Sequence, residues 1–249
     1  MARRRVRRSA RRPGIRIWTS MLLLAACLLS AGFIHMSRDG RVVESNLILV
    51  NKQRRLPAGY VPGDLRAVDV RFARYATAER HKLRDEAAGS LERMFEAATA
   101  DGLRLIAVSG YRSYDSQDDI RALRGRQAGE EHASRYIADA GASEHQTGLA
   151  MDVCSEDCAD LIEEFSDTDE YRWLLAHAAE YGFIIRYPEG GEAVTGYAFE
   201  PWHLRYVGDE AGAIAKSGLP LESYLAKYHP EPEFVGDWQG VGSSRSRRW

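Results

Sequence analysis

The segment "SEHQTGLAMD" (Ser143–Asp152) places an imidazole and a carboxylate near the two ends of a compact stretch of chain. His145 and Asp152 are seven residues apart, and the small residues Gly148 and Ala150 lie between them. Side chains of these two types can act as metal ligands, as a catalytic pair, or as ordinary residues of a turn. The segment alone leaves all three interpretations open, so the rest of the chain has to decide between them.

Charge is distributed unevenly along the 249 residues. The formal net charge is −2, but residues 1–16 contain eight Arg and no acidic residue, so the remainder carries −10. The chain is 45% hydrophobic and 28% charged, which is an ordinary globular composition. A protein that coats nucleic acid would not combine a basic terminal tail with an acidic body. We therefore expect no nucleic-acid partner.

An apolar segment follows the Arg-rich tail. Residues 17–34, "IWTSMLLLAACLLSAGFI", contain no charged side chain, and 18 residues is the threshold length for a membrane span. The Arg residues on its N-terminal side predict that this end stays in the cytoplasm, with the body outside. We favour an uncleaved signal anchor over residues 17–35. The alternatives are a cleaved signal peptide and a lipoprotein signal that ends at Cys27, and all three export the body.

The remaining chain is expected to form a linker at residues 36–45, one domain at 46–229 and a flexible tail at 230–249, rich in Pro, Gly and Ser. Apolar periodicity predicts helices and strands within the domain. The expected helices cover residues 84–102, 116–127, 169–181, 209–216 and 221–227, and the expected strands cover 103–109, 183–187 and 196–207. Because these elements are mixed without a βαβ rhythm, the pattern predicts an α+β fold.

The exported body contains two cysteines, Cys154 and Cys158, at C-x-x-x-C spacing. In an oxidising compartment such a pair can close a small local disulfide. A zinc-thiolate site would need a second Cys or His pair at similar spacing, which makes the metal interpretation weaker. We favour the disulfide, and two free thiols are the remaining alternative.

The segment "EPWH" places Glu200 three residues before His203. Two His and one carboxylate, with an open fourth position, form a common catalytic zinc set, and a carboxylate that does not bind the metal can serve as general base. In a regular strand, however, residues three apart point to opposite faces, and Pro201 rules out an unbroken central ladder. A bend or bulge must therefore bring both groups into one pocket. The alternative is an edge strand on which Glu200 and His203 are simply exposed.

Three separate segments of the chain match a family pattern in sequence and in order: "SGYRSYDSQ" (109–117), "SEHQTGLAMDV" (143–153) and "EPWHLRYVG" (200–208). They resemble the signatures of the VanY-type D-alanyl-D-alanine carboxypeptidases, which are zinc peptidases that act on peptidoglycan. The resemblance covers about residues 46–229, nearly the whole exported body. It implies a small single α+β domain, with a central antiparallel sheet that is flanked by helices and carries the site.

The resemblance also implies roles for individual residues. One Zn²⁺ ion would be bound by His145, Asp152 and His203, and Glu200 would be the general base that later protonates the leaving amine. Arg112 matches the family arginine that contacts the substrate and steadies the oxyanion. Without the resemblance, Arg112 would be interpreted as a surface residue of the turn in "GYRS".

Three further residues match positions at the substrate site. Gln117 and Ser143 match polar residues that hold the substrate or support the site, and Trp202 matches an aromatic residue of the pocket wall. Simple core packing is the alternative for Trp202, because large aromatic side chains are often buried. The chain departs from the family at Ala140-Gly141, where relatives often carry Pro-Gly, but the Gly still permits the turn.

These observations predict a membrane-anchored zinc D,D-carboxypeptidase on the outer side of a bacterial membrane. It would remove the terminal D-Ala from peptidoglycan stem peptides that end in D-Ala-D-Ala. The alternatives are a D,D-dipeptidase, an L,D-carboxypeptidase or an endopeptidase on the same polymer, and a catalytically silent wall-binding module. A serine-type enzyme is not expected, because the chain has no S-x-x-K motif.

Overall fold

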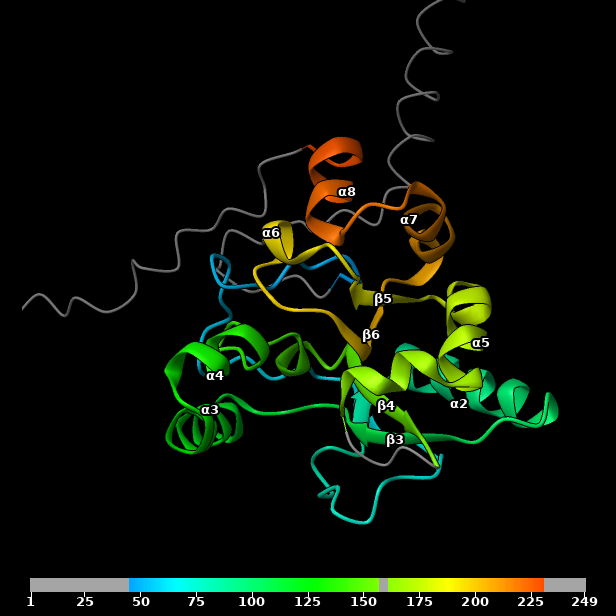
Figure 1. Ribbon diagram of the computed structural model, residues 1–249, viewed down its shortest axis with the longest axis horizontal. Helices are drawn as coiled ribbons and strands as arrows, with labels where there is room; N and C mark the ends of the chain where they lie inside the picture. The colour runs from blue at the N-terminus through cyan, green and yellow to red at the C-terminus, as the bar shows by residue number, and fades with distance from the viewer. Residues whose placement is uncertain (1–44, 157–160, 231–249) are drawn as a thin grey trace, which may run out of the picture. The chain divides into compact units, whose positions relative to one another are not determined.

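A computed structural model describes residues 45–156 and 161–230 of the chain (Figure 1). The expected Arg-rich tail (1–16) and anchor (17–35) lie outside this part. Nearly all of the expected linker (36–45) and C-terminal tail (230–249) do so as well. Within residues 45–156 and 161–230, no helix is both long enough and apolar enough to cross a membrane.

A four-stranded antiparallel sheet forms the centre of the domain, in the strand order β3-β4-β6-β5. The bounds of its strands are β3 Leu105–Ser109, β4 Ala150–Ser155, β5 Phe183–Tyr187 and β6 Glu200–Tyr206. A second, two-stranded antiparallel sheet pairs β1 (Leu65–Ala67) with β2 (Lys82–Arg84). The predicted α+β class with a central antiparallel sheet is therefore confirmed.

Helices surround the central sheet. Figure 1 shows α3 and α4 together on one side of it, α2 and α5 on the other, and α7 and α8 beyond β5. Their bounds are α2 Asp85–Ala100, α3 Tyr114–Ala128, α4 Glu130–Tyr136, α5 Asp169–His177, α6 Glu192–Thr195, α7 Ala211–Ser217 and α8 Leu221–Tyr228. Four short 3₁₀ helices complete the described part, at Glu144–Thr147 (η1), Glu163–Asp167 (η2), Ala178–Tyr181 (η3) and Gly208–Glu210 (η4).

Most of the expected elements are present with small differences at their ends. Helix α2 buries Leu91, Met94 and Ala98 on one face, as its apolar periodicity predicts, and ends before Gly102. The helix expected over residues 169–181 tightens to the 3₁₀ helix η3 in its last turn. The strand expected over 196–207 begins only at Glu200; Gly196, at φ +77°, ends the short helix α6 before it.

Strands β1, β2 and β4 and helices α4 and α6 were not expected from the sequence. Helix α4 follows Gly129, where a new helix starts after α3 has ended. Strand β4 has the sequence "AMDVCS", and all six of its residues are buried. A strand buried on both faces shows no alternation of polar and apolar residues, so the pattern that identifies a half-buried strand is missing.

The segment "EPWH" forms a bulge in β6. Ile185 of β5 pairs with Leu204, but the next pair along the strand joins Tyr187 to Glu200, so β6 has two extra residues here. Pro201, which has no N–H to donate, lies inside this irregularity. The predicted bulge is confirmed. The edge-strand alternative is wrong, because β6 lies between β4 and β5 and all of its residues are buried.

We expect Gly148→Ala to destabilise the domain more than Gly102→Ala. Both glycines have a positive φ, +68° and +84°, so an alanine costs about 1–2 kcal/mol of backbone strain at either position. A Cβ at Gly148 would also lie 2.8 Å from Leu65 Cδ2, whereas nothing lies within 4 Å of a Cβ at Gly102. Urea unfolding of the two variants measures the difference, and equal losses would contradict the tight packing assigned to Gly148.

Candidate metal centre

Three elements bring His145, Asp152 and His203 together. His145 lies in η1, Asp152 in β4 and His203 in β6, and the register of the β4–β6 pair places Asp152 directly opposite His203. Residues that face each other across an antiparallel pair project from the same side of the sheet. All three side chains are buried, and their potential ligand atoms lie within 4.8 Å of one another.

Each carboxylate oxygen of Asp152 faces one imidazole nitrogen. Asp152 Oδ2 is 3.2 Å from His145 Nε2, and Asp152 Oδ1 is 3.2 Å from His203 Nδ1. His145 Nδ1 lies 2.8 Å from the carbonyl oxygen of Gly110, which can only accept a hydrogen bond. The Nδ1 proton is therefore directed to Gly110, and the lone pair on Nε2 points into the cluster.

The donor set suits a divalent metal. Asp152 Oδ1 is buried and has no hydrogen bond among the described residues. Burial alone would raise the pKa of Asp152, but His145 and His203 hold it well below its usual range, so the carboxylate is ionised. Two imidazole nitrogens and one carboxylate oxygen match a zinc site with an open fourth position.

The two histidines differ in their protonation. Burial lowers the pKa of His145, which favours the neutral imidazole. Burial also lowers the pKa of His203, but Asp152 and Glu144 outweigh it and raise the value to about 9. Because a metal binds the deprotonated nitrogen, metal binding at His203 is coupled to the release of a proton.

Glu200 lies beside this cluster without being one of the three grouped ligands. The bulge in β6 brings its Oε2 atom to 3.6 Å from His203 Nδ1. Burial raises the pKa of Glu200 to about 8, a rise that His203 opposes and Asp152 reinforces. A buried carboxyl group whose pKa lies near neutrality can both take up and return a proton.

Arg112 contributes a cation to the same site. Its Nη2 atom lies 3.7 Å from Asp152 Oδ2, and its side chain is only 11% exposed. Nη1 donates a hydrogen bond to Gln117 Oε1 (2.7 Å) and Nη2 donates one to Ser109 Oγ (3.0 Å). The alternative interpretation of Arg112 as an exposed turn residue is therefore wrong.

The other predicted site residues are all buried. Gln117 accepts the hydrogen bond from Arg112 and donates one to the carbonyl oxygen of Ala138 (2.7 Å), so its amide supports Arg112. Ser143 immediately precedes η1, and Trp202 lies in β6 between Glu200 and His203. Contact of these three side chains with a substrate stays a prediction.

The sequence interpretation missed Glu144, the neighbour of His145. Its Oε1 atom accepts hydrogen bonds from Arg186 Nε (2.7 Å) and Arg205 Nη1 (2.6 Å), and its Oε2 atom lies 3.5 Å from His203 Nε2. The available signal was an arginine inside each of two apolar strands, "FIIRY" and "HLRYV". A charged residue in a buried strand requires a buried partner of opposite charge.

The cysteine prediction is only partly within the described residues. Cys154 is buried in β4, two residues after Asp152. Cys158 falls in residues 157–160, outside the part of the chain that the structure describes. The disulfide between Cys154 and Cys158 therefore stays a prediction.

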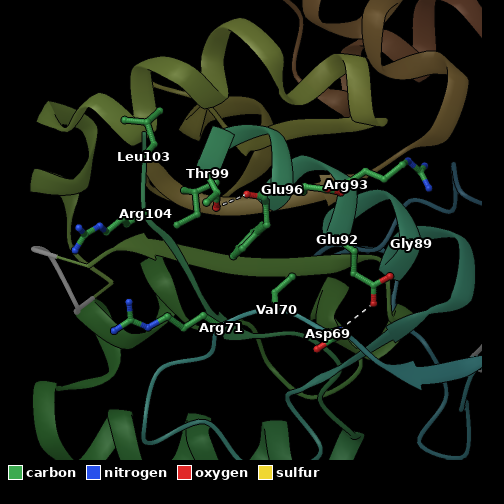
Figure 2. A pocket seen from close by; sticks show the side chains of 12 residues that line it. Asp69, Val70, Arg71, Gly89, Glu92, Arg93, Glu96, Thr99, Leu103 and Arg104 are labelled. Atoms are coloured by element: carbon green, nitrogen blue, oxygen red, sulfur yellow. Dashed lines mark hydrogen bonds between the residues drawn. The ribbon is translucent and has the colours of Figure 1, made fainter. Parts of the chain in front are cut away.

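A hollow of about 800 Å³ lies between α2 and the start of β3, and its lining includes none of the candidate site residues. Figure 2 shows Arg71 and Arg104 at one end of it and Glu92 toward the other. These charges are already paired: both arginines contact Glu156, at 2.6 and 2.7 Å, and Glu92 contacts Arg66 at 2.6 Å. Because no candidate site residue lines it, the hollow is separate from the candidate metal centre.

Comparison with known proteins identifies relatives of the chain. The family model described as VanY, D-alanyl-D-alanine carboxypeptidase, matches residues 80–209. A D-alanyl-D-alanine carboxypeptidase of Enterococcus faecalis is 39% identical over 198 residues, which are 75% of this chain and 68% of that protein.

Two solved structures are similar in both fold and sequence. The LdcB LD-carboxypeptidase has a TM-score of 0.68 and 44% identity, with 78% of this chain and 94% of that chain covered. A mutant of the D,D-pentapeptidase VanY from a VanB-type resistance cassette, solved in complex with Zn(II), has a TM-score of 0.59 and 34% identity. That comparison covers 72% of this chain and 98% of that one.

We expect the purified chain to bind one divalent metal ion and His203→Ala to lose most of that binding. The substitution removes one of the three ligands, whereas the matched control His177→Ala removes a half-exposed imidazole that contacts Glu180. Elemental analysis after dialysis measures the bound metal. Equal metal content in both variants would refute the assignment of His203 as a ligand.

Proposed function

The chain belongs to the VanY family of D-alanyl-D-alanine carboxypeptidases and is a metallo-carboxypeptidase, and we propose that it is a zinc-dependent D,D-carboxypeptidase of peptidoglycan. It would remove the C-terminal D-Ala from stem peptides that end in D-Ala-D-Ala. The observation that carries this proposal is the placement of the buried Glu200 beside the cluster of His145, Asp152 and His203.

The metal would be held by His145 Nε2, the carboxylate of Asp152 and His203 Nδ1. The fit of this donor set to zinc and the Zn(II) complex of the related VanY support this assignment. A zinc ion bound there supplies Lewis acidity, which lowers the pKa of a water molecule and polarises the scissile carbonyl.

Glu200 would move the proton. As the ionised carboxylate it accepts a proton from the water that attacks the carbonyl carbon between the last two residues of the stem peptide. It then gives this proton to the nitrogen of the departing D-Ala, so that the C–N bond breaks, D-Ala leaves with a neutral amine and the shortened stem peptide keeps the new carboxyl group. Burial suits Glu200 to both steps, because a carboxyl group whose pKa is raised to about 8 can take up and return a proton near neutral pH.

Arg112 would stabilise the negative charge that develops on the carbonyl oxygen during the attack. Its guanidinium group is fixed before the substrate arrives, because Ser109 and Gln117 accept its hydrogen bonds. A cation that is already oriented in a buried site stabilises such a charge without the cost of reorganisation.

The proposed setting is the outer face of a bacterial cell membrane. The uncharged run of residues 17–34 and the eight arginines before it support a single-pass anchor with its N-terminus in the cytoplasm. An anchored domain on that side would meet its substrate, the peptidoglycan stem peptide, in the cell wall.

An L,D-carboxypeptidase is the second candidate, favoured by the 44% identity to the LdcB LD-carboxypeptidase. Mass analysis of products from defined stem peptides separates the two activities. A D,D-carboxypeptidase shortens the pentapeptide to the tetrapeptide, whereas an L,D-carboxypeptidase shortens the tetrapeptide to the tripeptide. Release of a dipeptide or of an internal fragment would instead indicate a dipeptidase or an endopeptidase, and no product from the zinc-loaded protein would indicate a silent binding module.

We expect Glu200→Gln to lower kcat by about 10²–10⁴-fold, since general acid–base catalysis typically contributes that much. The zinc content should stay at the wild-type level, because Glu200 is not a ligand. Glu96→Gln, at an exposed position on α2, is the matched control and should keep full activity. Rates of D-Ala release, measured beside zinc content, test the role. Wild-type activity in the Glu200 variant would overturn it.

We also expect a chelator to abolish the activity and added Zn²⁺ to restore it, because two imidazoles and a carboxylate bind the metal reversibly. Penicillin should have no effect, because the chain has no S-x-x-K motif to form an acyl-enzyme. D-Ala release with each addition provides the measurement. Inhibition by penicillin together with resistance to the chelator would contradict a metal-dependent mechanism.

A further inference from the structure

The two oxygens of Glu144 have different partners. Oε1 accepts one hydrogen bond from Arg186 and one from Arg205, while Oε2 accepts none and faces His203 Nε2 at 3.5 Å. Both Oε2 and Nε2 are buried, and neither has a hydrogen bond among the described residues. A proton on Nε2 would give each of these two atoms its partner.

The arginines that hold Glu144 are themselves fully engaged by protein groups. Arg186 has no exposed side-chain surface and makes hydrogen bonds with both carboxylate oxygens of Glu222, at 2.6 and 3.0 Å. Arg205 is equally buried and donates to the carbonyl oxygens of Asn46, Ile48 and Tyr206. Neither guanidinium is available to swing toward Oε2, so this oxygen stays directed at His203.

The charges within this network balance. Glu144 and Glu222 contribute two negative charges, and Arg186 and Arg205 contribute two positive ones. Glu144 is thus already compensated as a buried carboxylate, and it does not need a charged imidazole as a further partner. It can accept a hydrogen bond from the neutral form of His203, which is the form that binds a metal.

We propose that Glu144 is a positioning residue that keeps the proton of His203 on Nε2 and so presents the Nδ1 lone pair to the metal. This inference rests on the metal centre of the proposed function. An ionised carboxylate only accepts hydrogen bonds, so the nitrogen that faces it carries the proton. At His145 the arrangement is reversed: the carbonyl oxygen of Gly110 keeps the proton on Nδ1 and leaves Nε2 for the metal. The two histidines then bind through different ring nitrogens, each selected by its own acceptor.

The substitution Glu144→Gln tests this role with almost no change in shape. The Gln oxygen can still accept the hydrogen bonds from the two arginines. The amide NH₂ group then faces His203 Nε2, so a hydrogen-bond donor would lie opposite the protonated ring nitrogen. The proton is then favoured on Nδ1, where it competes with the metal. We expect the Zn²⁺ affinity to fall by about 10–100-fold, the range typical when the hydrogen-bond partner of a ligand is lost.

Glu222→Gln is the matched control. It removes the same charge from the same buried network but lies on α8, and Arg186 separates its carboxylate from Glu144. This variant should lose stability and yet keep a Zn²⁺ affinity close to that of the wild type. Competition with a chromogenic chelator gives the affinities of the full-length chains, and circular dichroism verifies that each variant is folded.

Wild-type affinity in a folded Glu144→Gln protein, or an equal loss in both variants, would overturn the proposal. If Glu144→Gln does not fold, ¹⁵N NMR of the histidine-labelled, zinc-loaded wild type decides: a protonated Nε2 on His203 supports the role, and a protonated Nδ1 overturns it. A wild type that binds Zn²⁺ without hydrolysing stem peptides refutes the proposed function alone. One that binds no Zn²⁺ refutes both.

Discussion

The pairing of β4 with β6 is the constraint on which the rest of the site depends. Its register sets Asp152 opposite His203, and the shifted pairing of β4 with β3 sets Ser109 on the other side of Asp152. A slip of one residue would turn every side chain of a strand to the opposite face of the sheet. The candidate ligands on β4 and β6, and the hydroxyl that accepts a hydrogen bond from Arg112, are therefore fixed by the two ladders that share β4.

Several charged side chains are buried in and beside the central sheet. Asp152, Glu144, Arg186 and Arg205 are all buried within a few residues of the metal centre. Removing one partner from a buried ion pair costs about 3–5 kcal/mol, because the remaining charge is left without compensation. The domain avoids this cost by pairing every one of these groups, and the pairing also joins the segment at Asn46 and helix α8 to the sheet.

Much of the fold was predictable from the sequence, and the exceptions have physical causes. The apolar face of α2 and the run "FIIRY" identify their elements locally. Strand β4 was missed because it is buried on both faces and carries Asp152 in its middle. In the site, the resemblance supplied the three candidate metal ligands and Glu200, which the structure places side by side. Glu144 was missed because its partners, Arg186 and Arg205, lie 42 and 61 residues away, and nothing in the local sequence indicates this pairing.

The bulge at Pro201 separates the proposed general base, Glu200, from the part of β6 that pairs with β4. Residues 203–205 are held by the ladder to β4, whereas Glu200 lies beyond that ladder, past the two extra residues of the bulge. Glu200 is thus outside the β4–β6 pairing that aligns Asp152 with His203. Under the proposed mechanism, a single codon change at position 200 would remove hydrolysis from a descendant of this chain and leave a folded domain with its three candidate metal ligands.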